Sequence, residues 1–239
     1  MAAQHIVRSY DKELKFLSKK IISMGEYAQN MIKESTRAII DDDKSLAIKV
    51  IEDDKLLDKL EREINEKAIS LIAKRQPMAI DLREIIGAIR ISSDIERIGD
   101  MAKSIAKRVE ILSILPKLSG INHSLENFSN LASKQVEDIF NCYTAQDVSR
   151  LDEIRDRDDQ LDSMYTSLFR ELLTYMIEDQ KNITLCTHLL FCAKNIERIG
   201  DHVTNIAEAL YFIVTGDYMD SDRPKDDLSH GVGNLPNNI

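Results

Sequence analysis

The stretch IERIGD occupies Ile95–Asp100, and the same six residues return at Ile196–Asp201. The similarity extends outward to earlier segments, where two aspartates of each copy align (Asp54 with Asp158, Asp58 with Asp162). The offset is 101 residues for IERIGD and 104 for the earlier segments, a difference that falls in a connecting loop, where length varies at little cost. An internal repeat of this kind predicts two halves of similar structure.

The composition favours long helices. Hydrophobic residues make up 43% of the chain, while Gly (8), Pro (4) and Trp (0) are scarce. Apolar residues recur at helical spacing, which predicts six helices, at about 9–40, 43–74, 79–112, 118–143, 146–177 and 182–214. Because short connections make neighbouring helices antiparallel, we expect an all-α fold of two tandem, pseudo-symmetric three-helix bundles.

The segments between these helices contain residues that typically begin or end a helix. The segment DDDKS (41–45) supplies an N-cap for the second helix, and TAQD (144–147) parallels it in the second half. Pro77 separates the second and third helices, and LPKLSG (115–120) is the expected linker. The predicted domains are therefore residues 1–115 and 116–216, followed by a mobile tail over 217–239 that lacks a helical period.

Charge and cysteine usage narrow the class of protein. The formal net charge is -9, which argues against a nucleic-acid partner because such binders carry a basic surface. Three cysteines without CxxC spacing and a charged first segment predict reduced thiols in the cytosol. No apolar run reaches the length of a membrane span, so we expect no direct membrane insertion.

The apolar residues of IERIGD are explained by helix packing. Ile95, Ile98 and Gly99 begin a continuous apolar stripe on the third helix. A glycine inside a helix costs about 1 kcal/mol relative to alanine, and close approach of a neighbouring helix would justify that cost. Gly200 repeats the arrangement in the second copy.

The two acidic residues of the motif are not explained in this way. Glu96 and Asp100 lie on a face that we expect to point away from the apolar stripe, and like charges at i, i+4 repel. Lys103 and Lys107 could pair with them in the first half. In the second half the equivalent residues are Thr204 and Glu208, so no lysine is expected to relieve the repulsion there.

In each half, the helix before the motif helix carries its own acidic pair, Asp54 and Asp58 or Asp158 and Asp162. This pair is expected to face the Glu and Asp of the motif. In an antiparallel hairpin, residues equidistant from the turn lie level, and the pairs of the first half are equidistant from Pro77. We call Asp54, Asp58, Glu96 and Asp100 the first acidic cluster, and Asp158, Asp162, Glu197 and Asp201 the second acidic cluster. Oxygen-rich groups suit Mg²⁺, Mn²⁺, iron or Ca²⁺. The residues alone leave open either metal sites or acid pairs on a solvated surface.

Neighbouring polar residues allow further interpretations. Asp94 and Asn195 could be outer ligands of a bound cation, with capping or solvent exposure as the alternative. His202 directly follows Asp201 and could add a ligand. Arg97 and Arg198 are expected to form surface ion pairs.

Sequence patterns of known enzymes are weak or missing. A ferritin-type site would need Glu-x-x-His, and a phosphotransfer bundle would use one exposed histidine such as His123 or His188. Neither a phosphate-binding glycine-rich loop nor a nucleophile–His arrangement is visible in the sequence. Cys186 and Cys192 are expected to pack in the core. We therefore predict no catalytic site.

The order of motifs from about residue 10 to 214 resembles the PhoU family. The matching segments are VIEDDKLLD, LIAKRQPMAIDLR, IERIGD, LLTYMIED and LFCAKNIERIGD. The resemblance implies paired three-helix bundles, often dimeric, that bind Mg, Mn, Fe or Zn through their acidic motifs. It assigns that role to both acidic clusters of this chain.

The resemblance also implies a function. Family members regulate phosphate transport and act as negative regulators of the phosphate-starvation response (the Pho regulon). They are cytoplasmic adaptors at the inner membrane, between the ATPase of the phosphate ABC transporter and a membrane sensor histidine kinase. One alternative is a metal-dependent helical-bundle enzyme, and another is an adaptor whose acidic residues serve only as a binding surface.

Overall fold

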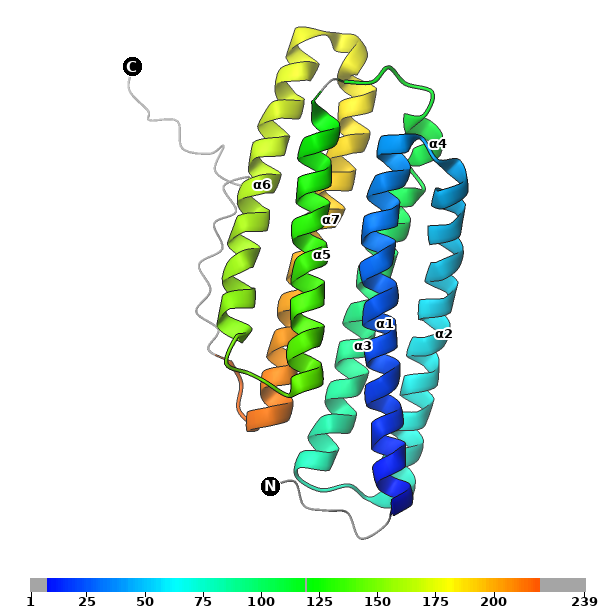
Figure 1. Ribbon diagram of the computed structural model, residues 1–239, viewed down its shortest axis with the longest axis vertical. Coiled ribbons are helices and arrows are strands. Elements are labelled where there is room, and N and C mark those ends of the chain that lie inside the picture. The colour runs from blue at the N-terminus through cyan, green and yellow to red at the C-terminus, as the bar shows by residue number, and fades with distance from the viewer. Residues whose placement is uncertain (1–7, 119, 220–239) are drawn as a thin grey trace, which may run out of the picture.

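The computed structural model describes residues 8–118 and 120–219, and these form an all-α structure, as predicted (Figure 1). Six long helices account for most of it: α1 (Arg8–Asp41), α2 (Lys44–Arg75), α3 (Ile80–Ala106), α5 (Ile121–Ala145), α6 (Leu151–Glu178) and α7 (Ile183–Thr215). Two short elements, α4 (Val109–Leu112) and the 3₁₀ turn η1 (Gln180–Asn182), lie in the connections. Within the described residues, no helix is both long and apolar enough to cross a membrane.

Local capping explains where several helices begin and end. The side chain of Asp43 accepts a hydrogen bond from the backbone N–H of Leu46, so it caps α2 as predicted. Gln76 then leaves α2 with a left-handed backbone (φ 50°), directly before Pro77. Gly216 ends α7 in the same way, with φ 85° and its N–H bonded to the Phe212 carbonyl.

Two predicted boundaries are wrong. The fifth long helix begins at Leu151 rather than near 146, because the Asp147 side chain accepts from the Ser149 N–H and closes a turn before the helix. The third ends at Ala106 rather than at 112. There the N–H of Arg108 bonds to the Ile105 carbonyl, three residues back instead of four, and α4 follows as a separate turn.

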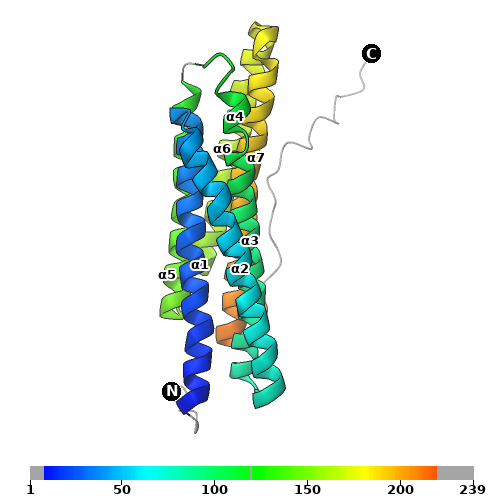
Figure 2. The same ribbon diagram turned by 90° about the vertical axis from the view of Figure 1, so that its right-hand side faces the viewer.

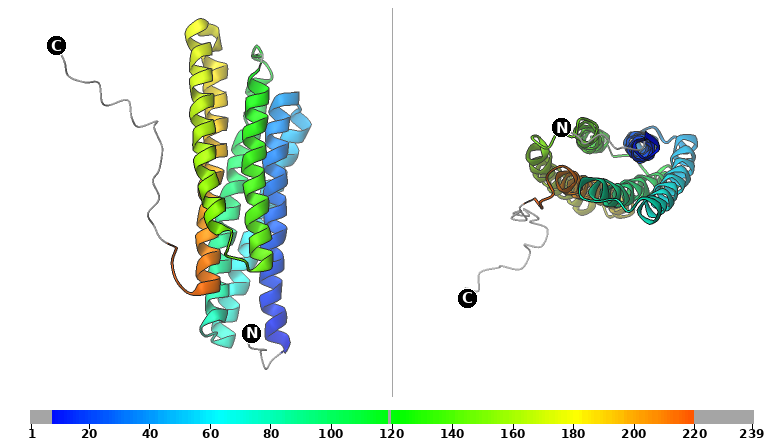
Figure 3. Two further views of the ribbon diagram at one scale, coloured as in Figure 1. Left: turned by 60° about the vertical axis from the view of Figure 1, so that its left-hand side comes forward. Right: turned by 90° about the horizontal axis from the view of Figure 1, so that it is seen from below.

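The two halves lie side by side and are joined by contacts of α3 with α7 and of α1 with α5. Seen from one end, α2, α3, α7 and α6 form a curved layer, and α1 and α5 lie together on its inner side (Figure 3). All the long helices follow the long axis (Figure 2). Because α3 and α7 run in opposite directions, the α2–α3 and α6–α7 connections lie at opposite ends of the molecule.

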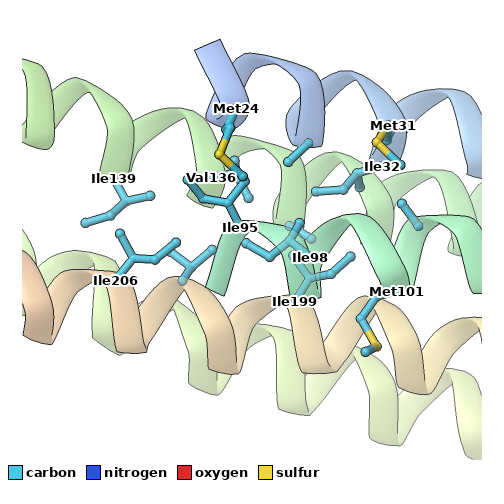
Figure 4. Packing of buried hydrophobic residues seen from close by; sticks show 14 of the residues in the cluster. Met24, Met31, Ile32, Ile95, Ile98, Met101, Val136, Ile139, Ile199 and Ile206 are labelled. Atoms are coloured by element: carbon cyan, nitrogen blue, oxygen red, sulfur yellow. The ribbon is translucent and has the colours of Figure 1, made fainter. Parts of the chain in front are cut away.

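One continuous hydrophobic core joins the halves. Ile95 and Ile98 of α3 meet Ile199 and Ile206 of α7, and residues of α1 and α5 cover them (Figure 4). All four isoleucines are fully buried, and burial of each such side chain contributes about 1.5–3 kcal/mol. The repeat therefore builds two similar bundles that share one core.

The predicted tail lies mostly outside the described residues, which extend to residue 219. The proposed domain limits 1–115 and 116–216 stay a prediction.

Candidate functional site

The first acidic cluster lies where α2 and α3 pack against each other. Lys103 Nζ of α3 is 2.5 Å from Asp54 Oδ2 of α2 and 3.1 Å from Asp100 Oδ1 of α3, so it joins the two helices. Asp58 is an electrostatic neighbour of both Asp54 and Glu96. The antiparallel hairpin thus brings together the residues that were expected to lie level.

The second acidic cluster has the same arrangement between α6 and α7. Asp158 of α6 lies directly over Gly200 of α7, and Glu197 is an electrostatic neighbour of Asp201 and Asp162. Lys194 Nζ lies 2.8 Å from Glu197 Oε1. The expectation that no lysine relieves this half is therefore wrong, and the overlooked signal is the i, i+3 spacing of Lys194 and Glu197.

Three of the acidic residues are buried, and for Glu197 this corrects the expectation that the acidic residues of the motif point away from the apolar stripe. Asp54 is 2% exposed, Asp158 4% and Glu197 8%. For Asp54 and Asp158, the reason is the glycine of each motif copy. Leu57 fills the space over Gly99, and Asp158 and Leu161 fill the space over Gly200, which confirms the predicted close approach of the neighbouring helix.

Burial raises the pKa of the carboxyl groups that these contacts enclose. It is the largest cause for Asp54, whose pKa is raised further by Asp58 and Asp100 against the opposing hydrogen bond from Lys103. Burial and then Asp100 raise the pKa of Glu96. Each group is therefore more easily protonated than an exposed carboxyl.

The pKa of Glu197 is raised in the same way. Burial comes first, the hydrogen bond and charge of Lys194 oppose it, and Asp201 and Asp162 add to the rise. Glu197 Oε2 is buried without a hydrogen-bond partner in the described part of the chain. A buried carboxylate oxygen of this kind favours an added proton or cation.

The carboxylates do not converge on a ready-made metal site. Among the described residues, no three His, Cys, Asp or Glu side chains are gathered as metal ligands. A cation such as Mg²⁺, which keeps several of its waters and uses one or two carboxylates, needs no such convergence. Metal binding at both clusters stays a prediction.

Asp94 connects the halves instead of capping a helix or facing solvent. Its Oδ1 lies 2.9 Å from His202 Nδ1 and 3.1 Å from Asn205 Nδ2, both on α7. His202 is therefore held by a residue outside the clusters. This polar contact between α3 and α7 could not be found from the sequence, because the spacing within one helix says nothing about the facing half.

The remaining candidates have ordinary surroundings. Arg97 lies near Glu96 (3.7 Å) and Asp100 (3.9 Å) as a surface ion pair, as predicted. His188 contacts Arg108, and His123 is exposed.

The cysteines also follow the prediction. Cys142, Cys186 and Cys192 are buried thiols, and burial raises the pKa of Cys192 to about 12.

Comparison with known proteins agrees with this architecture. The PhoU domain model matches twice, at residues 21–109 and 125–210. A relative from Rhizobium meliloti, named "Phosphate-specific transport system accessory protein PhoU homolog", is 51% identical over 98% of this chain and 99% of its own length. A relative of the same name from Caulobacter vibrioides is 45% identical over 94% of this chain and 98% of its own.

Two crystal structures have the same fold. PhoU from Pseudomonas aeruginosa has a TM-score of 0.82 and 30% identity, covering 87% of this chain and all of its own. The phosphate transport system regulatory protein PhoU from Streptococcus pneumoniae has a TM-score of 0.79 and 27% identity, covering 88% of this chain and 99% of its own. These names describe regulatory and accessory proteins, in agreement with the prediction that the chain is not an enzyme. The chain belongs to the PhoU family of phosphate-transport accessory proteins.

Proposed function

We propose that this chain is a non-enzymatic negative regulator of the phosphate-starvation response that accompanies the phosphate ABC transporter. The observation that carries the proposal is similarity over nearly the whole length to relatives named as accessory proteins of phosphate-specific transport. In this role it keeps the starvation response off while phosphate is plentiful.

The proposed mechanism is that of an adaptor between two partners, the transporter ATPase and a membrane sensor histidine kinase. The protein would act in the cytoplasm as a homodimer, held near the inner membrane by these partners. The shape supports such a role, because the repeat presents two similar hairpin ends at opposite ends of a long body (Figure 1).

A pull-down from cells tests the adaptor role. The affinity-tagged chain is recovered from cells grown in high and in low phosphate, and the co-purifying proteins are identified by mass spectrometry. We expect the transporter ATPase and the kinase in the eluate, in amounts that change with phosphate. Absence of both partners under both conditions would contradict the adaptor mechanism.

We further propose that the acidic clusters bind divalent or iron cations. The residues that would hold them are Asp54, Asp58, Glu96, Asp100, Asp158, Asp162, Glu197 and Asp201. A bound cation would neutralise carboxylates packed between two helices. Among the described residues, Oε2 of the buried Glu197 has no hydrogen-bond partner, which supports the fit of the second cluster, since a buried carboxylate oxygen needs a compensating positive charge.

Metal analysis of protein purified without chelator tests this second proposal. The wild type is compared with a variant in which Glu96, Asp100, Glu197 and Asp201 are all changed to alanine. A control with the same change of charge replaces four exposed carboxylates outside the clusters (Glu126, Asp156, Asp159 and Glu208). We expect metal in the wild type and the control but not in the cluster variant.

An equal metal load in all three proteins would contradict cation binding at the clusters. If the cluster variant loses partner binding without any metal dependence, the acidic residues form an interaction surface instead. Salt would then weaken partner binding strongly.

A further inference from the structure

The first turns of α1 carry exposed lysines that neither the core nor the acidic clusters use. Lys12, Lys15 and Lys19 follow one another at helical spacing, so they lie on one side of the helix, and all three are exposed. None of them forms an ion pair within the described residues. We call these three residues the basic face of α1.

The acidic residues of the same segment do not cancel this charge. Glu13 points to α2, where it pairs with Lys67 at 2.8 Å and with Arg75 at 3.0 Å. Asp11 is partly buried rather than exposed. The carboxylates of this part of α1 are therefore directed away from its exposed lysines.

The neighbouring surface of α5 is also uncharged. α5 runs antiparallel to α1 (Figure 1), and Phe140 packs on Gly25, so the end of α5 lies beside the first turns of α1. The exposed residues there include Asn141 and Thr144, which are neutral. The basic face thus stays uncompensated in a chain whose formal net charge is -9.

One aromatic side chain is exposed among these lysines. Phe16 follows Lys12 by four residues and precedes Lys19 by three, and it is 41% exposed. Lys20 lies over its ring, with Nζ 5.5 Å from the ring centre. An apolar ring bordered by ammonium groups is typical of helices that lie on a membrane surface.

The fold directs the basic face and the acidic clusters differently. α1 packs on α3, so its exposed side points away from the curved layer (Figure 3). The acidic clusters lie within that layer, between α2 and α3 and between α6 and α7. A negatively charged plane would attract the basic face and repel the clusters, which gives the molecule one preferred orientation.

We propose that the basic face of α1 binds the anionic headgroups of a lipid bilayer, so that the protein reaches the membrane surface directly as well as through protein partners. The contact is peripheral. The lysines lie against lipid phosphates, and Phe16 enters the headgroup layer. This inference goes beyond the proposed adaptor role and does not depend on cation binding by the acidic clusters.

A lipid surface fits this face better than an acidic protein does. Specific protein interfaces are built around a buried apolar centre, whereas Phe16 is the one large apolar side chain exposed among these lysines. Separate headgroups adapt to mobile lysine side chains without such a centre. Each lysine near an anionic surface strengthens binding by about fivefold, so three lysines together contribute about a hundredfold.

Sedimentation of the purified full-length protein with lipid vesicles tests the proposal. One set of vesicles contains phosphatidylglycerol mixed with phosphatidylcholine, and the other contains phosphatidylcholine alone. In the basic-face variant all three lysines are changed to glutamine, which keeps a similar helix propensity. A control variant makes the same change of charge at three exposed lysines elsewhere, Lys44, Lys107 and Lys181.

We expect the wild type to bind the anionic vesicles but not the neutral ones, and to bind less as the salt concentration rises. The basic-face variant should bind at least about tenfold more weakly, whereas the control variant should keep most of the wild-type binding. Circular dichroism of both variants shows whether they are folded.

A fluorescence measurement tests the predicted position of Phe16. The chain contains no tryptophan, so Phe16→Trp adds a single probe in the basic face. Phe191→Trp is the control, because Phe191 is exposed on α7 in the curved layer. With anionic vesicles, the emission of Phe16→Trp should shift to shorter wavelength and that of Phe191→Trp should stay unchanged.

Equal binding to both kinds of vesicle, equal losses in the basic-face and control variants, or an unchanged emission of Phe16→Trp would overturn the inference. Absence of wild-type binding to anionic vesicles would overturn it as well. If the basic-face variant then loses the transporter ATPase or the kinase in the pull-down, the face binds an acidic protein instead. The vesicle assay contains no protein partner, so its failure would leave the adaptor role intact.

Discussion

Gly99 and Gly200 occupy the same place in the two IERIGD copies, yet their neighbours differ. A methyl group on Gly99 would meet the flexible end of Leu57 at 2.5 Å. On Gly200 it would meet the carboxylate of Asp158 first and then Leu161 at 2.6 Å. The glycine is thus the residue through which each motif copy controls how closely an acidic side chain of the facing helix approaches.

We predict that Gly200→Ala destabilises the protein more than Gly99→Ala. Overpacking costs about 1–3 kcal/mol, and about 1 kcal/mol is recovered from the better helix propensity of alanine. At Gly99 the added methyl group would crowd one end of the buried Leu57 side chain, whereas at Gly200 it would crowd both the buried Asp158 carboxylate and Leu161. Denaturant unfolding of both variants measures the difference, and a larger loss for Gly99→Ala would contradict the packing described here.

The raised pKa of Glu197 makes the contribution of this residue to stability fall as the pH rises. Its ordinary value is 4.5, and burial is the main cause that raises the pKa in the folded chain. Stability from such a group is fully present below its unfolded pKa and is lost as the pH rises through the folded pKa.

Glu197→Gln should therefore reduce the loss of stability between pH 4.5 and neutral pH relative to the wild type. Glu208→Gln, at an exposed position of the same helix, serves as the control. Unfolding free energies measured across this pH range give the comparison. The interpretation is wrong if Glu197→Gln and the wild type lose stability in parallel.

At the scale of the helices, the sequence predicts the elements better than their ends. The 3.6-residue period locates all six long helices, because each buries one apolar face. Asp43 and Asp147 show why ends are harder. Both lie in the connection that follows a helix, but only Asp43 caps the next helix, whereas Asp147 closes a turn.

We predict that Asp43→Ala lowers the free energy of unfolding by about 0.5–2 kcal/mol, the usual effect of removing an N-cap. Asp41→Ala is the comparison, since Asp41 forms an exposed i, i+4 pair with Arg37 that contributes about 0–1 kcal/mol. Thermal and denaturant unfolding measure both effects. A smaller loss for Asp43→Ala than for Asp41→Ala would exclude the capping role.

At the scale of the whole molecule, the repeat predicts two bundles but not how they meet. The sequence could predict that the two acidic pairs of each half lie level, because both pairs belong to one helical hairpin. The helices α3 and α7 belong to different halves, and the contact of Asp94 with His202 joins residues 108 positions apart. No local spacing encodes them, so neither the shared core nor the polar link between halves could be predicted.

The shared core predicts that both halves unfold together. Ile98→Ala in α3 should lower stability by about 2–5 kcal/mol and should expose the thiols of the second half in the same transition. All three cysteines, Cys142, Cys186 and Cys192, lie in that half and are buried. Circular dichroism and thiol labelling along one denaturation series give the two curves.

Coincident curves are the expected result for one cooperative unit. Ile111→Ala, which changes an exposed isoleucine, provides the control and should shift neither curve by much. If helicity falls in two steps while the thiols stay protected through the first, the halves are independent domains.

The regulatory role is tested most directly by a reporter of the phosphate-starvation response in cells that lack this protein. In high phosphate, we predict that the reporter is on in the deletion strain and is switched off when the wild-type chain is restored. A reporter that stays equally repressed in high phosphate with and without the chain would contradict its role as a negative regulator.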